Sequence, residues 1–151
     1  MVKAGSSGQL WMESGTIHYE YQGGCWSVPV SDVKVIGEHT DDHGPGVDDY
    51  FFVFLTKTHS YEASFYAEGR DQLLDEISRE FGTPLVCDLV NSTDFRSRVM
   101  WPTSLAGQPL FDFLPKLRNE GLWSRCKDVL LPLVEYHLSE AVKLELNSSS
   151  K

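Results

Sequence analysis

The sequence has few basic residues, few cysteines and no long apolar run. Its 151 residues include 13 Lys and Arg against 22 Asp and Glu, which gives a formal net charge of −9. This balance disfavours nucleic acid and anionic membranes as partners, because both are bound through a surplus of basic side chains. No apolar run approaches the roughly 18 residues of a membrane span. Residues 1–8 are small and polar, so we expect a cytoplasmic protein without a signal peptide.

Cysteine chemistry is also poorly supported. The three cysteines, Cys25, Cys87 and Cys126, are widely spaced and form no CxxC pair. An odd number without such a pair provides neither a disulfide framework nor a metal clip. We expect free thiols in a reducing compartment, packed as small apolar side chains. No phosphate-binding loop, dinucleotide fingerprint or Ser/His/Asp order is present, so we expect a non-enzymatic protein without a cofactor.

Residues 9–66 show the alternation of β-strands. Residues 16–21 place Ile, Tyr and Tyr on one face and Thr, His and Glu on the other. Pro29 lacks an N–H, so its strand lies on a sheet edge or is interrupted there. The apolar phase then shifts by one residue, which predicts a bulge or sharp bend near residues 31–32. Residues 50–56 are apolar on both faces, which predicts a mid-sheet strand covered on each side.

Helical periodicity begins after this strand-rich half. Residues 70–81 place Leu73, Leu74, Ile77 and Phe81 on one face, and Gly82 follows as a stop signal. The later pattern is weaker: residues 85–90 suit a short strand, residues 111–120 suit a helix, and residues 122–146 suit a helix that is reset at Pro132.

These patterns predict an α+β protein with a flexible tail at each end. Residues 9–82 form an antiparallel sheet plus a helix, and residues 83–146 form a mixed and then helical extension packed on it. Residues 1–8 and 147–151 are small and polar, and we expect them to be flexible.

Four segments follow one another in a familiar order. They are the hairpin start Gly15-Thr16-Ile17-His18-Tyr19, the edge Trp26-Ser27-Val28-Pro29-Val30-Ser31-Asp32-Val33, the apolar run Asp49-Tyr50-Phe51-Phe52-Val53-Phe54 and the helix 70–81. This order resembles the pleckstrin-homology-like superfamily, in its GRAM and bacterial variants, over residues 9–82. The resemblance implies a strongly bent antiparallel sheet or partial barrel closed by the amphipathic helix, with a C-terminal helical extension. It also implies binding of lipid headgroups, peptides or proteins rather than catalysis.

The resemblance does not extend to phosphate binding. Residues 21–26, where the lipid-binding members place Lys and Arg, contain neither. Without these cations the loop has no groups that would chelate a phosphate.

An acidic window lies between the two halves of the predicted sheet. It contains no Lys or Arg, and its carboxylates are Glu38, Asp41, Asp42, Asp48 and Asp49. Gly44-Pro45-Gly46 at its centre predicts a loop. We interpret Glu38, Asp42, Asp48 and Asp49 as an interaction loop, since acidic side chains steer association with a basic partner.

The same window also offers possible metal ligands. His39, Asp41 and His43 combine two imidazoles with a carboxylate, a set that suits a transition-metal ion. No HExxH or EF-hand template is present, and a solvated acidic loop explains the residues equally well. A small metal-dependent hydrolase that uses these three residues therefore stays an alternative hypothesis.

One local cluster combines cations with an aromatic ring. Arg96 and Arg98 are two residues apart, so on an extended segment they share a face and could bind a carboxylate or phosphate beside Trp101. The other interpretation is that these arginines pair with Asp94 or the acidic loop and stack on the Trp101 ring. An anion- or small-ligand-binding domain is thus a further alternative.

The aromatic content supports the leading hypothesis. Four Trp, six Tyr and eight Phe in so short a chain make some solvent-facing aromatic surface expected. We therefore predict a protein-interaction module that binds another protein, or a second copy of itself, through aromatic surface and the acidic loop.

Overall fold

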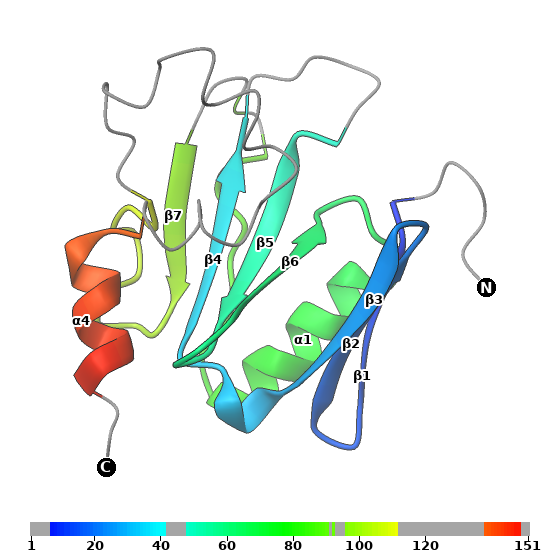
Figure 1. Ribbon diagram of the computed structural model, residues 1–151, viewed down its shortest axis with the longest axis horizontal. Coiled ribbons are helices and arrows are strands. Elements are labelled where there is room, and N and C mark those ends of the chain that lie inside the picture. Colours follow the sequence, from blue (N-terminus) through cyan, green and yellow to red (C-terminus); the bar gives the residue numbers. More distant parts are fainter. Residues whose placement is uncertain (1–6, 42–47, 91, 93–95, 112–137, 149–151) are drawn as a thin grey trace.

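The computed structural model describes residues 7–41, 48–90, 92, 96–111 and 138–148. In this part of the chain the fold is α+β, with two antiparallel sheets, two α-helices and no closed barrel (Figure 1). The first sheet has the order β1-β2-β3, with β1 at Gln9–Glu13, β2 at Thr16–Tyr21 and β3 at Gly24–Pro29. The second sheet has the order β6-β5-β4-β7, with β4 at Val35–Thr40, β5 at Tyr50–Leu55, β6 at Ser60–Ser64 and β7 at Arg96–Trp101.

Local sequence explains how the chain passes from the first sheet to the second. Ser14 and Gly15 both have positive φ angles, 51° and 74°, as a two-residue hairpin turn between β1 and β2 requires. The strand β3 is an edge strand that ends at Pro29, which has no N–H to donate to a ladder. A 3-10 turn, η1 at Val30–Asp32, then redirects the chain into β4. The bend expected near residues 31–32 is confirmed, and it divides the strands into two sheets.

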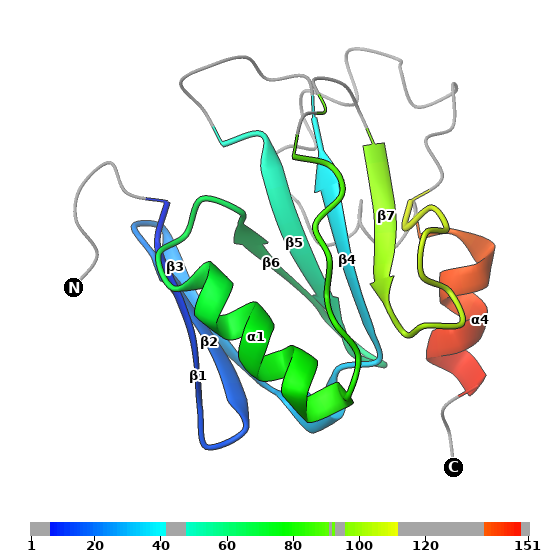
Figure 2. The same ribbon diagram turned by 180° about the vertical axis from the view of Figure 1, so that it is seen from behind.

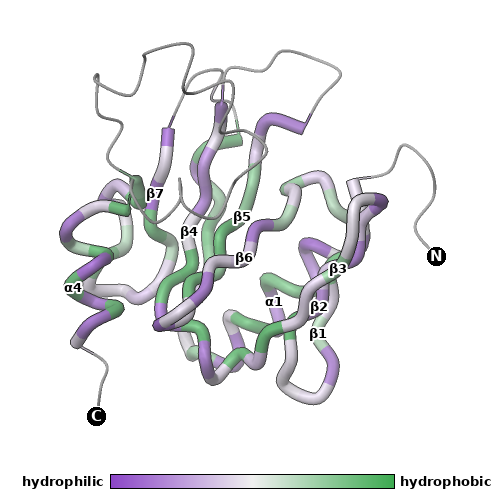
Figure 3. Tube along the Cα trace, viewed as in Figure 1, coloured by the Kyte–Doolittle hydropathy of each residue, from purple (hydrophilic) through white to green (hydrophobic). Residues whose placement is uncertain are grey.

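The central strand β5 is covered on both faces, as its sequence predicts. Phe52 and Phe54 point into a core shared with the first sheet and the helix α1, Arg70–Phe81. Val53 and Leu55 point the opposite way, into a second core beside the helix α4, Glu140–Ser148. Figure 3 shows hydrophobic residues along β5 and at the start of β4, and hydrophilic residues where these strands approach residues 42–47.

The predicted helix over residues 70–81 is confirmed as α1. It buries Leu73, Leu74 and Ile77 and packs beside β1 (Figure 2). Its end is a Schellman motif, in which Gly82, with a φ of 66°, donates its N–H to Arg79 O and Thr83 donates to Ser78 O.

The weaker predictions for the second half need correction. Residues 84–89 form no strand, whereas β7, which the sequence did not indicate, pairs with β4. The predicted helix over 122–146 is wrong at residues 138–139, because Leu138 forms a bridge to Phe111 and α4 begins only at Glu140. Pro132 and residues 112–120 lie outside the described residues.

The structure describes part of each segment that the sequence predicts to be a tail. Ser7 donates its hydroxyl to Asp48 Oδ1 at 2.9 Å, and Gly8 O accepts the Glu68 N–H at 2.9 Å. At the other end α4 extends to Ser148, which lies inside the segment expected to be a tail.

Candidate functional site

The β4–β5 hairpin brings the two ends of the acidic window together. Its last ladder pair is Thr40 with Tyr50, and the Asp41 N–H then donates to Asp49 O at 3.0 Å. Asp48 and Asp49 therefore lie at the surface end of the second sheet, beside Asp41. Asp42 and His43 lie outside the described residues.

An exposed tyrosine is hydrogen-bonded to this acidic segment. Tyr66, which follows β6 and is 50% exposed, donates its hydroxyl to Asp49 Oδ1 at 2.7 Å. The Asp49 carboxylate, which accepts this hydrogen bond, raises the pKa of Tyr66 to about 12, and partial burial and the charge of Asp48 act in the same direction. The phenol therefore stays protonated at physiological pH and remains a donor to Asp49.

The start of α1 adds a further carboxylate beside Tyr66. Tyr66 and Asp71 both line a shallow surface depression at this end of the helix. The neighbouring cation, Arg70, is already engaged: it donates to Phe65 O at 2.8 Å and to Asp71 at 2.9 Å, and its guanidinium lies 3.9 Å from the centroid of the Phe65 ring. We call Asp48, Asp49, Tyr66 and Asp71 the acidic–aromatic patch.

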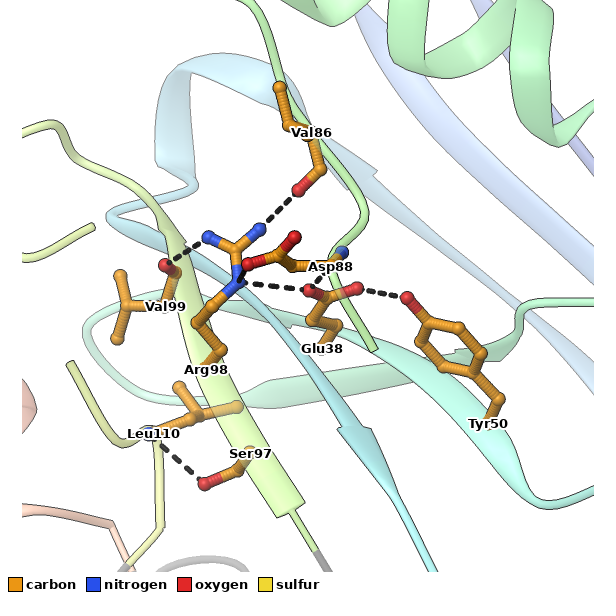
Figure 4. Close-up of polar contacts among 8 residues, drawn as sticks. All are labelled: Glu38, Tyr50, Val86, Asp88, Ser97, Arg98, Val99 and Leu110. Carbon is orange, nitrogen blue, oxygen red and sulfur yellow. Dashed lines mark hydrogen bonds and ion pairs between the residues drawn. The ribbon is translucent and has the colours of Figure 1, made fainter. Parts of the chain in front are cut away.

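Glu38 does not belong to an exposed loop, so its assignment to the interaction loop is wrong. It lies on β4 and its side chain is fully buried. Its Oε2 accepts a short hydrogen bond from the Tyr50 hydroxyl, and its Oε1 accepts from the Asp88 N–H at 2.9 Å and from Arg98 Nε at 3.1 Å (Figure 4). Glu38 is thus the centre of a buried polar network that includes a neutralising guanidinium.

Arg98 is bound inside the protein by all three of its side-chain nitrogens. Besides Nε, which reaches Glu38, one terminal nitrogen donates to Val86 O and the other donates to Val99 O at 3.4 Å. Asp88 adds a second carboxylate at 3.9 Å. The network therefore fastens the extended segment 86–88 to β4 and β7 and leaves Arg98 few donors for an outside anion.

The structure gives Arg98 and Trp101, two members of the predicted cluster, different partners. Arg96 and Arg98 do share a face of β7, where their ladder partners are Thr40 and Glu38. The Trp101 ring instead stacks on Phe81, with 4.1 Å between centroids and 10° between planes. Arg98 pairs with Glu38 of the acidic window, as the alternative interpretation expects, although Glu38 is buried. Asp94 lies outside the described residues.

His39 points to the face of β4 opposite Glu38 and binds a different carboxylate. Its Nε2 lies 2.8 Å from Glu62 Oε2, and its ring stacks on Phe51 and meets Phe111 edge-on. Among the described residues no group of three or more His, Cys, Asp or Glu side chains is placed to hold a metal ion. Since His43 lies outside those residues, the His39, Asp41 and His43 site stays a prediction.

The two described cysteines have different environments. Cys25 is exposed on β3, whereas Cys87 is half-buried beside the Glu38 network. Burial, aided by the charge of Glu38, raises the pKa of the Cys87 thiol to about 11. Burial and the hydrogen bond to Glu38 also raise the pKa of Tyr50. Both groups keep their protons at neutral pH, so neither is poised to act as a nucleophile.

Sequence reasoning missed Tyr50, Tyr66 and Cys87 as partners of the acidic window. Each contact joins residues far apart along the chain, for example the 17 positions between Tyr66 and Asp49. Only for Tyr66 did the sequence offer a hint of surface exposure, because Tyr66 lies in the connection between the last alternating strand and the helix that begins at residue 70.

These observations define a class of protein: an α+β domain that displays an acidic surface and contains a buried carboxylate–guanidinium network. No protein-family model, curated protein or solved structure matches the chain. None of the helices in the described ranges has the length and apolar content needed to cross a membrane. Function must therefore be argued from the geometry of this chain alone.

Proposed function

We propose that this chain is a non-enzymatic interaction module that binds a positively charged protein partner through the acidic–aromatic patch. The observation that carries the proposal is the hydrogen bond from the exposed Tyr66 hydroxyl to Asp49, which joins an aromatic ring to the acidic window at the surface. Tyrosine is enriched at protein interfaces, since its ring is apolar and its hydroxyl is polar.

The charge of the patch supports a basic partner. It holds three carboxylates, of which Asp71 is paired with the Arg70 guanidinium, so Asp48 and Asp49 carry its surplus negative charge. The net charge of −9 extends this negative field over the molecule. Such a field speeds encounter with a cationic surface, and it is screened over about 8–10 Å at physiological salt.

The proposal is tested with a lysine-rich peptide as the cationic probe. We expect the peptide to shift the backbone amide signals of residues 48–49 and 66–71 in a heteronuclear NMR titration, and its affinity to fall as salt rises. Asp48→Asn with Asp49→Asn should weaken binding, while Asp75→Asn with Glu80→Gln, a matched loss of two charges on the exposed side of α1, should not. Binding that is indifferent to salt and to the double variant would show that the patch is not the site.

We further propose that the fold is a variant of the pleckstrin-homology-like architecture. The support is the order of hairpin, edge strand with Pro29, apolar strand β5 and helix α1, together with the packing of α1 beside β1. An experimental structure tests this proposal: the two sheets should pack face to face at a steep angle, with α1 across the open end. Two sheets packed with nearly parallel strands would contradict it.

A further inference from the structure

Within the part of the chain that the structure describes, one face of the first sheet is not covered by another element. Its strands alternate strictly, so that Leu10, Ile17 and Val28 point inward with at most 1% exposure. The side chains between them point outward and are exposed or half-buried. In Figures 1 and 2, α1 lies on the inner side of β1–β3, and no described element lies on the outer side. We call this surface the outer sheet face.

Trp11 lies on the outer sheet face, and neighbouring side chains fix the position of its ring. Trp11, His18 and Ser27 are direct ladder partners across β1, β2 and β3. The Trp11 and His18 rings stack with 5.2 Å between centroids and 17° between planes, and His18 Nδ1 lies 2.7 Å from Ser27 Oγ. Trp11 nevertheless stays 37% exposed. Its indole is held in place before any partner arrives, which lowers the entropy lost on binding.

Carboxylates flank this tryptophan, and among the described residues no Lys or Arg forms an ion pair with them. Glu13 and Glu20 point outward on either side of the Trp11–His18–Ser27 row. Glu68 lies next to β1 at the edge of the outer sheet face. It forms a parallel bridge to Gln9, and its backbone oxygen accepts the Leu10 N–H at 2.8 Å. Residues 9–29 contain no Lys or Arg at all. Within the described chain these three glutamates form no ion pair.

We infer that the outer sheet face docks an extended, cationic segment of a partner protein, with an Arg or Lys side chain over the Trp11 indole. A tryptophan face is the strongest aromatic site for a cation. On an extended peptide, side chains two residues apart share a face and are separated by about 6.6–6.8 Å. On β1, Gln9 lies two residues before Trp11 and is the ladder partner of Glu20, so the pair Gln9–Glu20 lies at the same spacing from Trp11. If one cation of the bound peptide lies over Trp11, a second cation two residues along the peptide would therefore lie near Glu20 and Glu68.

This inference rests on the proposed function, because it describes the shape of the same cationic partner. The two surfaces also adjoin: Glu68 lies two residues from Tyr66, and Ser7, just before β1, donates to Asp48. A partner segment that crosses the outer sheet face would therefore continue toward the acidic–aromatic patch.

The experiment compares two peptides of equal charge, acetyl-Gly-Arg-Gly-Arg-Gly-amide and acetyl-Gly-Arg-Arg-Gly-Gly-amide. We expect the first to bind more tightly, because only its arginines share a face when it is extended, and to shift the indole N–H signal of Trp11. Trp11→Ala should weaken its binding about three- to fivefold, as expected for an exposed cation–π contact. Trp11→Phe should retain part of the affinity, and Glu20→Gln should weaken binding.

Controls separate the possible failures. Glu80→Gln removes a carboxylate from the exposed part of α1 and should leave the affinity unchanged. If Trp11→Ala and Glu20→Gln have no effect while Asp48→Asn with Asp49→Asn weakens binding, the inference is wrong and the proposed function stands. If neither set has an effect, both fail. A neutral oligosaccharide such as maltohexaose that shifts the Trp11 indole, where the peptides do not, would overturn the inference in favour of sugar binding.

Discussion

The two sheets of this protein use their faces differently. The first sheet packs one face on α1 and the second sheet and leaves the other face with Trp11, Glu13 and Glu20 at the surface. The second sheet packs both faces, one in each core. Where both faces are covered, a polar side chain must find its partners inside, as Glu38 does. Where one face is free, polar and aromatic side chains stay available to a partner.

The largest effect should follow from breaking the buried network of the second sheet. Arg98→Met leaves the Glu38 carboxylate buried without a cation, so the free energy of unfolding should fall by about 3–5 kcal/mol. Urea unfolding followed by circular dichroism measures this. Adding Glu38→Gln, whose amide oxygen can accept from the Asp88 N–H while its NH2 donates to the Tyr50 hydroxyl oxygen, should recover much of the loss. A cost below about 1 kcal/mol for the single variant would mean that water reaches the network.

The same covered environment should suppress the chemistry of Cys87. Burial raises the pKa of the Cys87 thiol to about 11, so the native thiolate fraction near neutral pH should be on the order of a hundredfold lower than in the unfolded chain. Alkylation by iodoacetamide at pH 7.5, followed by mass spectrometry with and without urea, measures this ratio, and exposed Cys25 serves as the internal reference. The shift stabilises the native state fully below pH 9, and this contribution is lost as pH rises toward 11. Equal native rates at Cys25 and Cys87 would contradict the assigned burial.

An alanine substitution at Gly37 tests how closely Leu110 packs on the face of β4 opposite Glu38. A Cβ at this position would lie 2.6 Å from Leu110 Cδ2 and 3.1 Å from Arg98 O, beside the register shift between β4 and β7. Gly37→Ala should therefore cost about 1–3 kcal/mol by overpacking. Combining it with Leu110→Ala removes the side chain that clashes, so the cost of the alanine at position 37 should be smaller in that background. An additive pair of costs would show that the Leu110 contact is not the cause.

The smallest effect on stability should come from the outer face of the first sheet. Trp11 is 37% exposed and stacks on its cross-strand neighbour His18, so Trp11→Ala should lower the free energy of unfolding by about 1 kcal/mol or less, the scale of a cross-strand aromatic pair. Thermal unfolding of the two proteins gives the comparison. A loss above about 2 kcal/mol would mean that this face is covered in the native protein, and the contrast between the two sheets would no longer hold.

Local patterns were sufficient for the first sheet and for α1. The alternation of residues 16–21, the turn at Ser14 and Gly15 and the helical spacing of Leu73, Leu74 and Ile77 all act within one or two turns of chain. Residues 84–89 show the limit of such patterns. Leu85 and Leu89 point inward as in a strand, but this stretch is tied to the fold by side chains of Ser78, Glu38 and Arg98 instead of a ladder.

The candidate site was predictable only in part. The acidic window and the expectation of exposed aromatic surface led to Asp48 and Asp49, but nothing local indicated that Tyr66 would bind Asp49. The same window misled at Glu38, because a carboxylate among acidic neighbours is normally solvated.

The sequence by itself determined the strand at residues 16–21, the covered strand that begins at Tyr50, the helix over residues 70–81, the bend after Pro29 and the negative charge of the molecule. Only the tertiary structure decided that β7 joins β4, that Glu38 is buried and that one face of the first sheet stays open. The physical reason is range. Hairpin turns and helix ends depend on neighbouring residues, whereas a buried charge is stable only if a partner such as Arg98, 60 positions away, arrives at the same point in space.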